Sequence, residues 1–186
     1  PGAPNPSVEA ILHALIPFRY VDHTHADAVV TLTNTPDGEA RVREIYGDRL
    51  LVVPYVMPGF VLAKKVAQMT EDIDWSTLEG MILMNHGIFS FADDAWESYA
   101  RMIDLVTKAE QALGEASPVA NDTAEASALE LAAIRYEVSQ AANRPLLAAF
   151  DGGVQSCGFA RRGDVKSIAT RGPLTPDHVI RTKRVP

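Results

Sequence analysis

Apolar residues recur along this chain with two different periods, which predict helices alternating with strands. Residues 8, 11, 12 and 15 are apolar and would form one stripe of a helix that Ser7 caps. The helical period also runs through residues 93–113, and a further helix is expected over residues 60–69. Another helix, capped by Asp122 or Thr123, is expected to end at about residue 141.

Other stretches have the short apolar runs or the β-branched character of strands. We expect strands at residues 28–33, in LLVV before Pro54, and in GMIL before the break at 85–87. Two more are expected in PLLAAFD and VQSCGFARR, the second of which holds Cys157 as a small core residue. Strands interleaved with helices imply a layered α/β domain, and we expect one domain over residues 1–186.

Composition excludes several classes of function. The net charge of −7 opposes nonspecific binding to nucleic acid, and the basic run 181–184 reads as a solvated tail. No apolar run approaches the roughly 20 residues of a membrane span. The single cysteine excludes an internal disulfide framework and suits a cytoplasmic location.

The segment VDHTH, residues 21–25, is the strongest candidate for chemistry. In a strand, His23 and His25 would point to the same side and could bind one metal ion. The alternative is a pair of polar residues on the wet side of a strand. Asp22 would either orient an imidazole or be a solvated acid at the strand end.

His86 adds a third imidazole at the end of a buried strand. The adjacent Gly87 would let the backbone turn sharply there, and the alternative role is a turn histidine bonded to a carbonyl. Three histidines are the number that a catalytic zinc uses when it keeps one coordination position open.

Four segments in order, PSVE, HTHADAVV, VPYVMPG and MILMNHG, resemble the class II aldolase/adducin family over roughly residues 6–113. The resemblance implies a three-layer α/β/α domain with a mixed, mostly antiparallel sheet. It also implies Zn²⁺, or another divalent metal, bound by His23, His25 and His86. Glu9 would be the catalytic acid/base, whereas without the resemblance it would only complement a helix dipole.

The implied reaction is a metal-dependent aldehyde-lyase reaction that cleaves a ketose 1-phosphate to dihydroxyacetone phosphate and an aldehyde. The tail ATRGPLTPDHVIRTK resembles a subgroup, associated with rhamnulose-1-phosphate aldolase, in which a short-chain dehydrogenase domain follows. This chain has no glycine-rich dinucleotide fingerprint. The alternatives are a sugar-phosphate epimerase on the same scaffold and a non-catalytic, adducin-like interaction domain.

The resemblance further implies a homotetramer with its active sites at subunit interfaces. A tyrosine would donate a proton to the aldehyde oxygen, and Tyr55 and Tyr136 are both open candidates. We expect His13 and His178 to be structural. We also expect the domain to lack its N-terminal part, which would leave the phosphate-binding residues outside this chain.

Overall fold

The described part of this chain comprises residues 2, 5–7, 9–114 and 123–174 of a computed structural model. Its strands are β1 (Tyr20–Thr24), β2 (Leu50–Val53), β3 (Gly80–Leu83) and β4 (Gly87–Ala92). They form one sheet in the order β1-β4-β3-β2, in which β4 is antiparallel to both neighbours and β2 is parallel to β3. The sheet is therefore mixed and mostly antiparallel, as expected.

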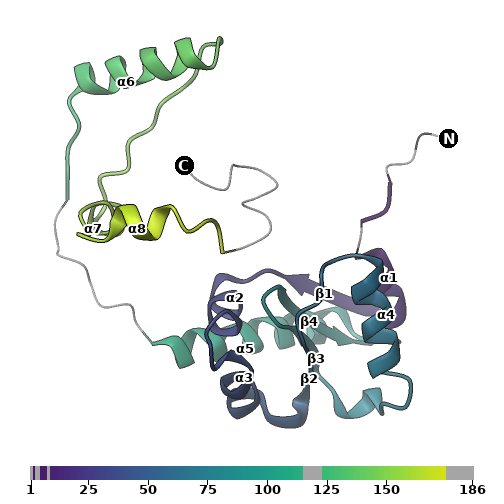
Figure 1. Ribbon diagram of the computed structural model, residues 1–186. Coiled ribbons are helices and arrows are strands. Elements are labelled where there is room, and N and C mark those ends of the chain that lie inside the picture. The colour runs from purple at the N-terminus through teal and green to yellow at the C-terminus, as the bar shows by residue number, and fades with distance from the viewer. Residues whose placement is uncertain (1, 3–4, 8, 115–122, 175–186) are drawn as a thin grey trace. The chain divides into compact units, whose positions relative to one another are not determined.

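Helices cover both faces of this sheet (Figure 1). On one side lie α1 (Ala10–Leu15) and α4 (Phe60–Met69), and on the other lie α2 (Asp27–Thr33), α3 (Gly38–Tyr46) and α5 (Ala95–Leu113). Short 3-10 turns at Gly47–Arg49 and Trp75–Thr77 precede β2 and β3.

The side-chain period of two along the strands sorts the core into two halves. Ile82 and Ile88 pack with α2, α3 and α5, whereas Met81 and Phe89 pack with α1 and α4. The three-layer α/β/α arrangement is confirmed.

The expected strand at residues 28–33 is wrong, because α2 occupies Asp27–Thr33. Its β-branched residues favour a strand by propensity, yet Val29, Val30 and Leu32 are all buried. Val29 and Leu32 belong to the half of the core that α2, α3 and α5 form with the sheet. Tertiary packing overrides local propensity here.

The N-terminal helix begins later than the apolar stripe suggests. α1 starts at Ala10, and Glu9 is its N-cap residue. The Ser7 hydroxyl accepts a hydrogen bond from the Glu9 amide at 3.2 Å, and the Ser7 carbonyl accepts one from the Ala10 amide. Ser7 thus orders the entry to the helix, and Glu9 stands just ahead of its first turn.

The chain divides into two compact units, and the expectation of one domain over residues 1–186 stays a prediction. Among the described residues, the first holds those up to Gly114 with Pro173 and Leu174, and the second holds Thr123–Gly172. The second unit contains α6 (Ala128–Ala141), α7 (Val154–Ala160) and α8 (Val165–Ala169).

Three expectations for the second unit are wrong. Ser127, in a capping box with Glu130, precedes α6 in place of Thr123, and Asp122 lies outside the described residues. Neither PLLAAFD nor VQSCGFARR is a strand. Cys157 is buried, as expected, but it lies in the helix α7. Just before this helix, the Asp151 carboxylate accepts a hydrogen bond from the Gly153 amide.

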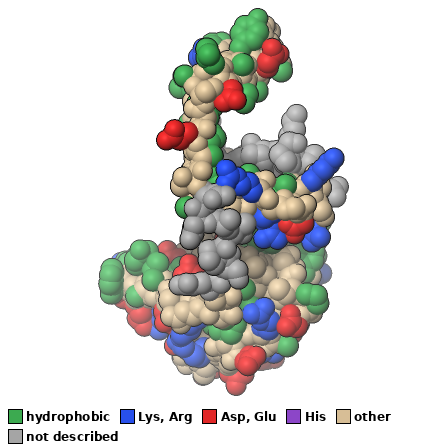
Figure 2. Space-filling view, turned by 90° about the vertical axis from the view of Figure 1, so that its left-hand side faces the viewer, with side chains coloured by type: hydrophobic (Ala, Val, Ile, Leu, Met, Phe, Trp, Pro, Cys, Tyr) green, Lys and Arg blue, Asp and Glu red, His purple; other side chains and the backbone are tan. Residues whose placement is uncertain are grey.

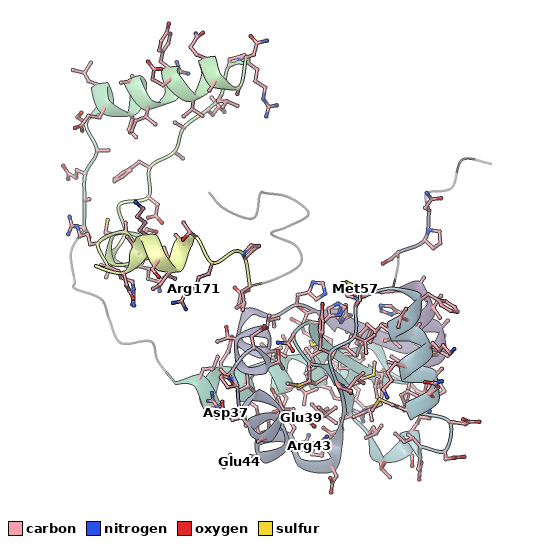
Figure 3. The ribbon with its side chains drawn as sticks, in the orientation of Figure 1. Asp37, Glu39, Arg43, Glu44, Met57 and Arg171 are labelled. Carbon is pink, nitrogen blue, oxygen red and sulfur yellow. The ribbon has the colours of Figure 1, made fainter. Side chains whose placement is uncertain are left out.

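The surface of the first unit shows no concentration of one charge on the face drawn in Figure 2, where acidic and basic side chains are interspersed. On α3 the exposed Arg43 donates to Glu39 one turn earlier at 2.8 Å (Figure 3), a pair worth only a few tenths of a kcal/mol. No helix among the described residues is long and apolar enough to cross a membrane. His178 and the basic run 181–184 lie outside the described residues.

Candidate metal centre

Four ionisable side chains converge on the α1 and α4 side of the sheet. His23 lies on β1 opposite Phe89 of β4, and His25 follows the last residue of β1. His86 lies in the turn that joins β3 to β4, and Glu9 precedes α1. Pairing of β1 with β4 therefore brings residues that are more than sixty positions apart into one cluster.

The cluster is centred on one carboxylate oxygen. Glu9 Oε1 is 3.0 Å from Nε2 of His86, 3.1 Å from Nε2 of His23 and 3.8 Å from Nε2 of His25. The Nε2 atoms of His23 and His25 are themselves 3.1 Å apart. The His86 side chain is 3% exposed and that of His25 is 18% exposed, so the cluster lies at the edge of the core with one side open to solvent.

Proton positions in this cluster favour a cation among the ring nitrogens. His23 Nδ1 lies 3.0 Å from the carbonyl oxygen of Ile88, which can only accept, so Nδ1 carries the proton. In a neutral ring, Nε2 is then a bare lone pair that faces the Glu9 carboxylate. A lone pair this close to an anionic oxygen is unfavourable unless a proton or a metal ion lies between them.

The donor set also fits a metal ion by its dimensions. One ligand atom from each of the four residues lies within 4.8 Å of the others. A tetrahedral zinc ion with Zn–N bonds of about 2.0–2.1 Å separates its ligand atoms by roughly 3.3 Å. The observed separations of 3.0–3.8 Å between Glu9 Oε1 and the three nitrogens bracket that value.

The ring of His23 is held in place from two sides. It stacks on Phe89 with 4.0 Å between ring centroids and an angle of 16° between the planes. Together with the hydrogen bond to Ile88, this contact sets both the tautomer and the orientation of the imidazole, as outer partners of metal-binding histidines do.

Gly87 has a different role from the one expected. Its φ is not in the left-handed region, and the residue that takes up the sharp turn is Asn85, with φ of 58°. A Cβ at Gly87 would lie 2.6 Å from the Thr24 carbonyl oxygen, 2.9 Å from His25 and 3.0 Å from His23. Glycine is required because the histidine-bearing strand approaches it closely.

The surroundings shift the pKa values of two nearby groups. Hydrogen bonds from His23, and then from His86, hold the pKa of the Glu9 carboxyl far below its usual value, although burial opposes them. His13 packs its edge against Phe89 at 5.3 Å between centroids and is not one of the clustered residues. Burial and then the nearby His23 lower the pKa of His13, and Glu9 and Asp22 oppose this.

The cluster contains all four predicted site residues and leaves out the other candidates. Asp22 points to the opposite face of the sheet, where its carboxylate accepts a 2.6 Å hydrogen bond from Ser98 of α5, so it neither orients an imidazole nor is simply solvated. Tyr55 is 55% exposed in the loop that also holds Met57 (Figure 3), and Tyr136 belongs to α6 of the second unit.

Sequence reasoning missed the groups that support His23, namely the Ile88 carbonyl and the Phe89 ring. The GIFSF run gives no sign of which residue lies opposite His23, because that depends on strand register.

Comparison with known proteins supports this picture of the fold. The Class II Aldolase and Adducin N-terminal domain matches residues 1–113, and the second domain of class II aldolases matches residues 125–186. A similar solved structure is the N-terminal class II aldolase domain of a conserved protein from Thermoplasma acidophilum. It is 38% identical with a TM-score of 0.54, covering 61% of this chain and 51% of that one.

Two more distant relatives also match. The sugar-phosphate aldolase from Thermotoga maritima is 24% identical with a TM-score of 0.46, over 60% of this chain and 55% of that one, a likeness too slight to bear on function. An uncharacterized oxidoreductase of Bacillus subtilis (strain 168), YuxG, is 29% identical over 98% of this chain, which spans 28% of that protein.

The oxidoreductase relative is much longer than this chain and fits a two-domain arrangement. With a family match over more than half of its length, and with the α/β/α layers and the ordered motifs described above, this chain belongs to the class II aldolase and adducin family.

Proposed function

We propose that this chain carries the catalytic centre of a zinc-dependent class II aldolase, in which His23, His25 and His86 bind the metal and Glu9 is the acid/base. The observation that carries the proposal is the convergence of three Nε2 atoms on one Glu9 oxygen within 3.8 Å. The proposed substrate is a ketose 1-phosphate resembling rhamnulose 1-phosphate, cleaved to dihydroxyacetone phosphate and lactaldehyde.

A bound divalent ion supplies Lewis-acid stabilisation of the negative charge that appears when the carbon–carbon bond breaks. Glu9 handles the proton. In the condensation direction its carboxylate takes a proton from the carbon of dihydroxyacetone phosphate that becomes the nucleophile, and in cleavage it returns that proton. A carboxylate beside a bound cation would stay ionised and could therefore accept this proton.

The other residues orient this centre. His23 presents Nε2 because its Nδ1–H donates to the Ile88 carbonyl, and Phe89 supports the ring from below. His86 is almost fully buried, which excludes water from its side of the cluster. The homotetramer and the cytoplasmic location stay predictions.

The test separates proton transfer from substrate identity. Dihydroxyacetone phosphate alone is incubated in D₂O with the zinc-loaded protein, and proton NMR monitors the substrate. We expect one carbon-bound proton to exchange for deuterium. Glu9→Gln keeps the size and the hydrogen-bonding oxygen of the side chain but removes the base, and we expect exchange to slow by about 10²–10⁴-fold. Exchange that is absent from the wild type, or unchanged in Glu9→Gln, would contradict the assignment.

Cleavage of rhamnulose 1-phosphate is then measured by release of triose phosphate. An epimerase on this scaffold would convert a sugar phosphate to its epimer without releasing triose phosphate. An adducin-like interaction domain would show neither reaction.

A further inference from the structure

We propose that Asn85 is a positioning residue for His86, acting through its left-handed backbone and a side-chain hydrogen bond to Asn34. The inference rests on the proposed metal centre and adds to it a residue that touches neither metal nor substrate. It concerns the three-residue turn of Met84, Asn85 and His86 between the paired residues Leu83 and Gly87.

Both ends of this turn are fixed by the sheet. The Met84 amide donates to the Val53 carbonyl at the end of β2, at 3.0 Å, and the His86 amide donates to the Leu83 carbonyl at 3.1 Å. Between them Asn85 has φ of 58°, one of only two non-glycine residues with positive φ in the described part of the chain. Asparagine tolerates this conformation better than residues with larger or β-branched side chains, because its short amide bonds locally.

The Asn85 side chain ties the turn to α2. Its Nδ2 donates to Asn34 Oδ1 at 2.8 Å. Asn34 is the C-cap residue of α2, and its own Nδ2 donates to the Val30 carbonyl at 2.7 Å. Since that carbonyl can only accept, the amide nitrogen of Asn34 faces Val30 and its oxygen faces Asn85, so both orientations are set by one consistent network.

This network joins the two segments that supply the histidines. α2 begins at Asp27, two residues after His25, and the turn holds His86. Close contact at Gly87, next in the chain, leaves little space to absorb a displaced turn, because a Cβ there would already meet the backbone of Thr24 at 2.6 Å. A turn that relaxes at Asn85 therefore moves the His86 ring relative to His23 and His25.

Four variants separate the two contributions of Asn85. Asn85→Gly keeps the left-handed backbone at no steric cost and removes only the amide. Asn34→Ala removes the partner of that amide and also the hydrogen bond from Asn34 to the Val30 carbonyl. Asn85→Ala removes the amide and also disfavours the backbone conformation. Asn143→Ala is the matched control, since Asn143 has φ of 50° and lies in the second unit.

The first measurement is the affinity for Zn²⁺, titrated against a competing chelator. We expect Asn85→Gly and Asn34→Ala each to bind about 2- to 10-fold more weakly, and Asn85→Ala about 10- to 100-fold more weakly. The double variant Asn34→Ala/Asn85→Gly should bind no more weakly than Asn34→Ala alone, because that variant has already lost the hydrogen bond that Asn85→Gly removes. Asn143→Ala should bind as the wild type does.

Binding by Asn85→Ala within twofold of the wild type would overturn the inference while leaving the metal centre intact. So would a double variant whose loss equals the product of the two single losses. Circular dichroism of each variant confirms that it is folded.

The second measurement needs no metal. In the metal-free protein, Asn85→Ala is expected to shift the ring ¹⁵N resonances of His86, and Asn143→Ala to leave them in place. If the wild type binds no Zn²⁺, the proposed function fails and this comparison alone decides the role of Asn85. Unshifted His86 resonances in Asn85→Ala would then refute it.

Discussion

Replacing Gly87 by alanine tests whether close packing of β4 against the end of β1 sets the metal geometry. The added Cβ would lie 2.6 Å from the Thr24 carbonyl oxygen, and real Cβ atoms essentially never approach nearer than 3.0 Å. The backbone must therefore move, since the atom it meets is not the end of a flexible side chain. A move from 2.6 to 3.0 Å is already about twice the roughly 0.2 Å tolerance of metal–ligand bonds.

The same Cβ would lie 2.9 Å from His25 and 3.0 Å from His23, so the strain falls on two of the proposed ligands. Overpacking of this kind costs about 1–3 kcal/mol of stability, and we expect Zn²⁺ affinity to fall at least about tenfold. Calorimetric or circular-dichroism melting measures the first effect, and chelator competition measures the second.

Gly163→Ala is the control, because a Cβ there has no neighbour within 4 Å and the backbone is not left-handed. It should leave the Zn²⁺ affinity unchanged and, if anything, stabilise the fold slightly. A Gly87→Ala protein that melts and binds Zn²⁺ like the wild type would refute the reasoning from close packing.

Three further predictions concern the framework around the site. Burial, and then the nearby Asp104, raise the pKa of Tyr46 to about 12. The stability that this shift contributes is therefore complete below pH 10, the ordinary pKa of tyrosine, and is lost as the pH rises to about 12. The unfolding free energy should fall more steeply between pH 10 and 12 for the wild type than for Tyr46→Phe, and equal slopes would contradict this. Ser98→Ala removes the 2.6 Å donor to Asp22 and should cost about 1–3 kcal/mol in urea unfolding without changing Zn²⁺ affinity, whereas weaker metal binding would show that Asp22 does act on the site. Asp94→Ala removes the side-chain acceptor for the Glu97 amide at the start of α5 and should cost about 1 kcal/mol; a stability equal to that of the wild type would mean that water replaces the cap.

Local patterns predicted much of the first unit, because periodicity and breakers coincide there. The apolar run 50–53 ends at Pro54, and the amphipathic stretch of α5 begins after Asp94 and ends at Gly114. The same reasoning failed for Asp27–Thr33, where β-branched residues form a buried helix. It failed again for Val154–Ala160, where a strand is predicted but a helix forms after Asp151 accepts a hydrogen bond from the Gly153 amide.

The site, like the fold, was predicted only in part from the sequence. Residue type and spacing identified His23, His25 and His86, and the resemblance added Glu9. Their convergence depends on the antiparallel pairing of β1 with β4, which no single stretch of sequence encodes. Asp22 shows the limit most clearly, since its place beside two histidines suggested a role that the alternation of strand side chains rules out.

Metal content is the most direct test of the metal centre. Protein purified without a histidine tag and reconstituted with Zn²⁺ is measured by elemental analysis beside His23→Ala, which removes the ligand whose Nε2 lies 3.1 Å from both Glu9 and His25. We predict about one zinc per wild-type chain and a large loss of zinc in a folded His23→Ala protein. A folded wild type that retains no zinc, or a His23→Ala protein that retains the full amount, would contradict the metal centre described here.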